Sequence, residues 1–185
     1  MARLFSIKPA ITFKGRDFKG LRGFAGKPLH PPLTDIPIAA YVLAPTFDVI
    51  SFFSNGELSE NMFHASTYVL IAGLIVSIPT SLTGFWDWLK STPKHTQAWR
   101  TANWHMAVMV TVTLLVVVDL LVRDLSDGSV NTIGLILSLV VGLLVSLGAA
   151  YGGSMVFDYG FNVETSGDHP VWHESEEDVF PGQHD

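Results

Sequence analysis

Two histidines stand near the starts of long apolar segments, where an imidazole can hold a metal ion or a haem. His30 opens the stretch HPPLTDIPIAAYVL, and His105 lies within ANWHMAVMV. An ionisable side chain near the end of a membrane helix usually faces the bundle interior and has a partner. Two imidazoles suit haem iron, and two imidazoles with a carboxylate suit non-haem iron or zinc. His30 and His105 are therefore candidate haem or metal ligands, with Asp87 as a carboxylate that orients them.

Each of these residues also has an interpretation without a cofactor. His105 could extend to the lipid headgroups, and His30 could be a solvated residue in a loop before the helix. Asp87, in TGFWDWLK, could simply pair with neighbouring Lys90. The sequence leaves these alternatives open.

Prolines surround His30. Pro31, Pro32 and Pro37 fix their own backbone φ and restrict the residue before each of them. In one interpretation, the restricted backbone at the start of the helix positions His30 and Asp35 at the open end of a helix bundle. In the other, proline is simply favoured in the first turn of a helix.

A second polar cluster is expected at the opposite ends of the same segments. Asp48 lies late in the first apolar segment, His64 lies early in the second, and Asp119 lies late in the third. His64 is expected near Asp48 across a short loop, where the two could form a charged pair. Asp48 and Asp119 could alternatively lie at frayed helix ends.

The elements that position these residues are four membrane helices. Of the 185 residues, 48% are hydrophobic and only 15% are charged, a balance typical of a small integral membrane protein. A helix needs about 20 apolar residues to cross the hydrocarbon core. Four segments meet this requirement: 36–54, 62–89, 102–122 and 130–151. We predict an all-α, polytopic four-helix bundle over 30–153, with a basic N-terminal segment 1–29 and an acidic C-terminal tail 154–185.

Charge sets the expected orientation and partners. Residues 1–28 hold seven of the eleven Lys and Arg against one acid, whereas 154–185 hold eight acids and no Lys or Arg. Lys90, Lys94 and Arg100 lie in the middle connection, so the positive-inside rule predicts a multi-pass inner-membrane protein with both termini in the cytoplasm. The charged ends suit contacts with lipid or with other membrane subunits, and nucleic-acid binding is not expected. The absence of cysteine excludes thiolate metal sites from this chain.

Several blocks of the sequence resemble a family of uncharacterised predicted four-helix bacterial membrane proteins, whose members are sometimes associated with Rieske iron–sulfur domains. The blocks are HPPLTDIPIAAYVLAPTFDVIS, GLIVSIPTSLTGFWDWL, RTANWHMAVM and YGGSMVFDYGFNV, which together span 30–163. The resemblance implies a family signature at His30, Pro31, Pro37, Asp48, Asp87, His105 and the Gly152–Gly153 pair. It also implies redox membrane biology, by association alone.

These observations favour a small integral subunit of a larger redox membrane complex. The chain shows no hydrolase, kinase or nucleotide-binding signature, and we expect no catalytic activity from it alone. A second hypothesis is a b-type haem protein for electron transfer, with His30 and His105 as the ligands. A metal site made of histidine and aspartate, or a small transporter, are further alternatives.

Overall fold

Four long helices make up most of the protein in the computed structural model, which describes residues 11–124, 126 and 128–163. They are α2 (His30–Phe53), α3 (Gly56–Ser91), α4 (Gln97–Asp124) and α5 (Thr132–Phe157). A 3-10 turn, η1 (Gly20–Arg22), precedes an antiparallel hairpin of β1 (Gly23–Phe24) and β2 (Lys27–Pro28). All four long helices are apolar enough to cross a membrane. The expected all-α, four-helix membrane architecture is therefore confirmed.

The helices extend beyond the predicted apolar segments. His30 is the first residue of α2 instead of part of a preceding loop. In the last helix, α5 continues through Gly152 and Gly153 to Phe157, beyond the predicted limit at residue 151. Hydropathy reports only the part of a helix that matches the membrane core, so polar or glycine-containing end turns are missed.

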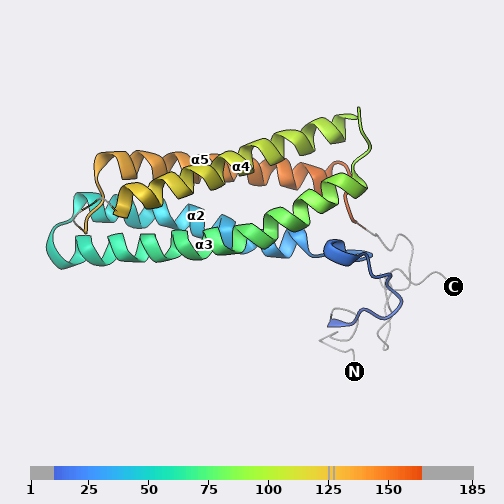
Figure 1. The fold of residues 1–185 in the computed structure, drawn as a ribbon, viewed down its shortest axis with the longest axis horizontal. Coiled ribbons are helices and arrows are strands. Elements are labelled where there is room, and N and C mark those ends of the chain that lie inside the picture. The colour runs from blue at the N-terminus through green and yellow to red at the C-terminus, as the bar shows by residue number, and fades with distance from the viewer. Residues whose placement is uncertain (1–10, 125, 127, 164–185) are drawn as a thin grey trace, which may run out of the picture.

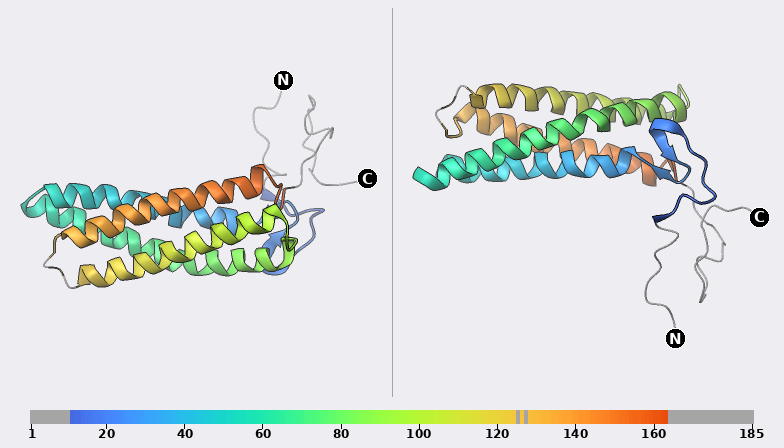
Figure 2. Two further views of the ribbon diagram at one scale, coloured as in Figure 1. Left: turned by 90° about the horizontal axis from the view of Figure 1, so that it is seen from above. Right: turned by 60° about the horizontal axis from the view of Figure 1, so that its bottom comes forward.

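The helices form a bundle of two hairpins, α2–α3 and α4–α5 (Figure 1). α2 packs against both α3 and α5, and α4 packs mainly against α5, so that α2 and α4 are diagonal across the bundle. We call the end that carries His30 and His105 the histidine end, and the end that carries Asp48 and Asp119 the aspartate end. The β1–β2 hairpin, the α3–α4 connection and the last turn of α5 all lie at the histidine end (Figure 2).

Small and hydroxylated residues of α3 allow it to approach α2 closely. The buried positions of α3 are Ser59, Phe63, Ser66, Leu70, Gly73, Ser77, Thr80 and Thr83. Their hydroxyl groups bond to nearby atoms: Ser66 donates to the carbonyl of Ala44, and the hydroxyls of Tyr41 and Ser77 are 2.9 Å apart. Such small and polar contacts hold helices together in lipid, where burying apolar side chains gives little advantage.

A proline inside α2 explains one bond between these two helices. Pro37 has no N–H, so the carbonyl of Leu33, four residues earlier, loses its partner within the helix. The Thr80 hydroxyl of α3 donates to that carbonyl at 3.1 Å. The proline therefore ties α2 to α3, as expected in a membrane, where a freed carbonyl must find a protein donor.

Replacing Gly73 with alanine is expected to destabilise this interface. A Cβ atom there would lie 2.8 Å from both the Ala40 Cβ and the Tyr41 Cε1 atoms. Overpacking of this kind costs about 1–3 kcal/mol, which outweighs the helix propensity gained by removing a glycine. The free energy of unfolding in a detergent titration measures the loss. The exposed neighbour Ala72 is the control, since Ala72→Val should change stability by less than about 0.5 kcal/mol.

Candidate functional site

His30 and His105 meet inside the bundle at the histidine end. They come from the diagonal helices α2 and α4, and their ring centroids are 6.3 Å apart with an interplanar angle of 85°. Both side chains are partly buried between the helices. The two candidate ligands that were 75 residues apart in sequence are thus neighbours in space.

Each imidazole is held by a backbone carbonyl of the neighbouring helix. His30 Nδ1 is 2.9 Å from the Thr80 carbonyl on α3, and His105 Nδ1 is 2.8 Å from the Gly148 carbonyl on α5. A carbonyl only accepts hydrogen bonds, so each Nδ1 carries the proton and donates it. In a neutral imidazole this leaves the Nε2 lone pair available, which is how metal-binding histidines are commonly oriented.

A glycine one turn further along each helix makes room for the ring. Gly84 follows Thr80 by four residues, and Gly152 follows Gly148 by four. A Cβ atom at Gly84 would lie 2.5 Å from His30 Cε1, and one at Gly152 would lie 3.2 Å from His105 Cε1. Since a helical carbonyl points toward the residue four positions ahead, the missing side chain there lets the imidazole reach the carbonyl.

The two helical hairpins therefore carry the same set of groups in the same order: a histidine, an aspartate, a backbone carbonyl and a glycine. The first helix of each carries a histidine and then an aspartate: His30 and Asp48 in α2, His105 and Asp119 in α4. These pairs are separated by 18 and 14 residues, or about 27 Å and about 21 Å of helix. The second helix of each carries the carbonyl and the glycine. The two hairpins thus hold their histidines with matching contacts.

Asp87 does not hydrogen-bond to either histidine. Its carboxylate accepts from Arg22 Nε of the N-terminal segment at 3.0 Å, in place of the predicted pairing with Lys90 or orientation of an imidazole. Arg22 also donates to the hydroxyl of Ser91 at 2.5 Å and to the Asn162 side chain at 3.3 Å. Backbone carbonyls orient the histidines, and Asp87 fastens the N-terminal segment to the bundle. Asp35 is exposed.

At the aspartate end, Asp48 and Asp119 share one arginine. Arg123 Nε is 3.1 Å from Asp119 Oδ1, and Arg123 Nη2 donates to Asp48 Oδ2 and, at 3.3 Å, to Asp119 Oδ2. Both carboxylates are 0% exposed, so they do not lie at frayed helix ends. We call these three residues the Asp–Arg–Asp triad.

His64 does not join the triad. Its Nε2 atom is 3.8 Å from Glu60 on the exposed face of α3, so the predicted pair with Asp48 is wrong. Arg123 takes that place, although the predicted segment 102–122 stops one residue before it. Its spacing of four residues from Asp119, one helical turn, was the available signal.

No group of three or more His, Cys, Asp or Glu side chains within the described residues lies close enough to hold a metal ion. The pair of histidines is therefore not extended to a three-ligand site by Asp87 or another carboxylate of this part of the chain. Any metal group at this site would have to bring most of its own ligands.

Comparison with known proteins gives a family but no function. No curated protein and no solved structure matches the chain. A family model described as a predicted membrane protein matches residues 26–165, which include all four helices and both polar clusters. The chain therefore belongs to the DUF2231 family of predicted membrane proteins.

Proposed function

We propose that the protein binds one b-type haem between His30 and His105 and carries electrons as a small subunit of a larger redox membrane complex. The observation that carries the proposal is the paired orientation of the imidazoles, each with Nδ1–H bonded to a carbonyl and Nε2 left to bind iron. Four-helix bundles commonly bind cofactors through side chains of facing helices.

The separation of the rings fits one metal centre. A single metal centre held by both imidazoles would require the two rings to be close neighbours. The observed separation is 6.3 Å. A haem brings most of the iron ligands itself, so His30 and His105 would be sufficient to hold it, which suits a site without a third ligating side chain among the described residues. Gly84 and Gly152 provide the space in which both rings are held.

The chain's own residues would set the properties of the bound group. Haem iron supplies one-electron transfer between its ferric and ferrous states. The carbonyls of Thr80 and Gly148 fix the ring orientations, and hydrogen bonding from Nδ1–H makes Nε2 a better donor to iron. Pro37 contributes indirectly, since the carbonyl it frees holds Thr80 against α2.

The proposed location and partners follow from charge. Lys90, Lys94 and Arg100 lie in or beside the α3–α4 connection at the histidine end, which favours the cytoplasmic side of the inner membrane for this end. The basic segment 1–29 and the acidic tail 154–185 are the proposed contacts with other subunits. Most of that tail lies outside the described residues. A haem at this end would exchange electrons with a partner at the cytoplasmic face.

A reduced-minus-oxidised optical spectrum of the purified protein, supplied with haem during expression, tests the proposal. We expect a b-type α-band and Soret band in the wild-type protein. His30→Ala and His105→Ala should each abolish bis-histidine ligation and its spectrum while the protein still inserts into the membrane. His64→Ala is the matched control, because His64 is an exposed histidine at the other end and should leave the spectrum unchanged.

A flat wild-type spectrum after reconstitution with haem would overturn the haem assignment. The protein would then be an accessory subunit without a cofactor. In that case, deletion of segment 1–29 should abolish co-purification of partner subunits and have no spectral consequence.

A further inference from the structure

The Asp–Arg–Asp triad at the aspartate end carries an excess of acidic groups in a buried place. The side chains of Asp48, Asp119 and Arg123 are 0%, 0% and 3% exposed. Arg123 donates to both carboxylates and so can balance the charge of only one. If both carboxylates were ionised, the triad would hold a net negative charge away from water, which costs several kcal/mol.

No other charged side chain within the described residues compensates for this excess. α3 contributes Thr67, whose hydroxyl is 3.5 Å from Arg123 Nη1, and Phe63, whose ring lies 5.7 Å from the guanidinium carbon. α5 contributes Gly134, which adjoins Asp119. The nearest charged pair on α3, Glu60 with His64, is exposed, as is Asp124 of α4.

One carboxylate oxygen points to the position of a ligand. Asp48 Oδ1 is fully buried and has no hydrogen-bond partner among the described residues, whereas Oδ2 of the same group accepts from Arg123. A buried carboxylate oxygen without a donor is destabilising, and protonation removes its charge. The unpartnered oxygen and the unbalanced charge are two separate features, and a proton on Asp48 would neutralise the oxygen and balance the charge of the triad.

We propose that Asp48 and Asp119 bind one proton between them at neutral pH, which makes the triad an electrically neutral proton-binding site. This inference does not depend on haem binding, because the triad and the histidine pair lie at opposite ends of the bundle. Two carboxyl groups that share a site ordinarily retain one proton in this way, since the like charges disfavour double ionisation.

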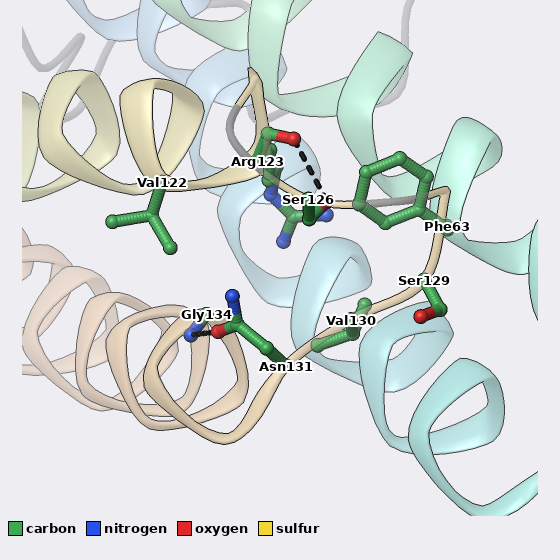
Figure 3. Close-up of a pocket in the computed structure, with 8 residues that line it drawn as sticks. All are labelled: Phe63, Val122, Arg123, Ser126, Ser129, Val130, Asn131 and Gly134. Carbon is green, nitrogen blue, oxygen red and sulfur yellow. Dashed lines mark hydrogen bonds between the residues drawn. The ribbon is translucent and has the colours of Figure 1, made fainter.

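A small pocket adjoins the triad. The pocket lies under the α4–α5 connection and includes Arg123, Ser126, Ser129, Asn131 and Gly134 in its lining (Figure 3). Ser129 and Asn131 are exposed, whereas Arg123 and Gly134 are buried. The lining thus includes exposed residues of the α4–α5 connection and the guanidinium that contacts both carboxylates.

Infrared spectroscopy of the full-length protein tests the proposal, because a protonated carboxylic acid has a C=O stretch separate from the bands of a carboxylate. We expect one buried carboxylic acid band at neutral pH in the wild-type protein. Asp48→Asn and Asp119→Asn should each abolish it, because the remaining carboxylate is then balanced by Arg123 and ionises. Glu60→Gln, at the same end but exposed, should leave the band unchanged.

Three results would overturn the proposal. The first is the absence of the band from the wild-type protein at neutral pH. The second is persistence of the carboxylic acid band in either Asp48→Asn or Asp119→Asn. A single correctly folded variant of the two is therefore sufficient for this test. The third is a band that appears only when Na⁺ and K⁺ are removed, which would make the triad a site for a monovalent cation.

Discussion

Replacement of Arg123 with methionine is expected to lower the free energy of unfolding by about 3–5 kcal/mol, the typical cost of breaking a buried ion pair by removing one partner. Methionine keeps much of the length of the arginine side chain and removes its charge. Asp48 and Asp119, both 0% exposed, would lose the guanidinium that binds them. No other described cation lies beside them to take its place.

The effect should depend on the carboxylates and not on the volume of Arg123. We therefore expect the triple variant Asp48→Asn, Asp119→Asn, Arg123→Met to recover most of the lost stability, because neutral amides replace the uncompensated charges. Unfolding of each variant in a detergent titration measures both effects. A loss in the triple variant as large as in Arg123→Met would contradict this explanation.

Arg100 provides the control on the same helix. It lies near the start of α4 and is exposed, so Arg100→Met should change stability by no more than about 0.5 kcal/mol. A loss at Arg100 equal to that at Arg123 would show that the measurement reports charge removal in general. The contrast between the two positions isolates the buried ion pairs.

The architecture could be predicted from the sequence because hydropathy and helix length are local properties. The four apolar segments and the gathering of polar residues at the two ends were both visible in the order of residues. The predicted helix ends were less accurate, as at His30 and at Gly152. The end turns of these helices are not hydrophobic enough to be recognised from hydropathy.

The partners of the polar residues could not be predicted in the same way. The third predicted segment, 102–122, stops one residue before Arg123, although a carboxylate one turn earlier allows this arginine to remain in the buried part of α4. His64 was placed near Asp48 by position along the chain, but its direction around α3 takes it to the exposed face. Rotation of each helix about its axis depends on packing between helices, which sequence position does not give.

The carbonyl bonds to the histidines were missed for a different reason. The groups that orient His30 and His105 belong to the backbone of Thr80 and Gly148, which have no side-chain signature for this role. The available signal was the glycine four residues after each carbonyl. Gly84 carried no prediction and Gly152 lay beyond the fourth predicted segment, 130–151, so only the structure shows that each glycine adjoins an imidazole.

Substitution of Gly84 with alanine is expected to weaken haem binding by about 10–100-fold, the typical effect of disturbing a residue that orients a metal ligand. The added Cβ would lie 2.5 Å from His30 Cε1, 2.8 Å from Nδ1 and 3.0 Å from Nε2, so the ring must move. Movement would break the 2.9 Å bond to the Thr80 carbonyl and displace Nε2 from its present position. Titration of the haem-free protein with haem, followed in the Soret band, measures the affinity.

The equivalent change in the other hairpin separates this steric explanation from a general effect of losing glycine. In Gly152→Ala the closest ring atom, His105 Cε1, would lie 3.2 Å from the new Cβ, so a small adjustment suffices and haem affinity should fall by less than about tenfold. Gly153→Ala is the neutral control, since its nearest side-chain atom is 4.0 Å away in Phe157. Equal losses at all three glycines would contradict the proposed ring positions. A graded loss, largest at Gly84 and absent at Gly153, is expected if the spacing between each glycine and its imidazole determines how the histidines hold the haem.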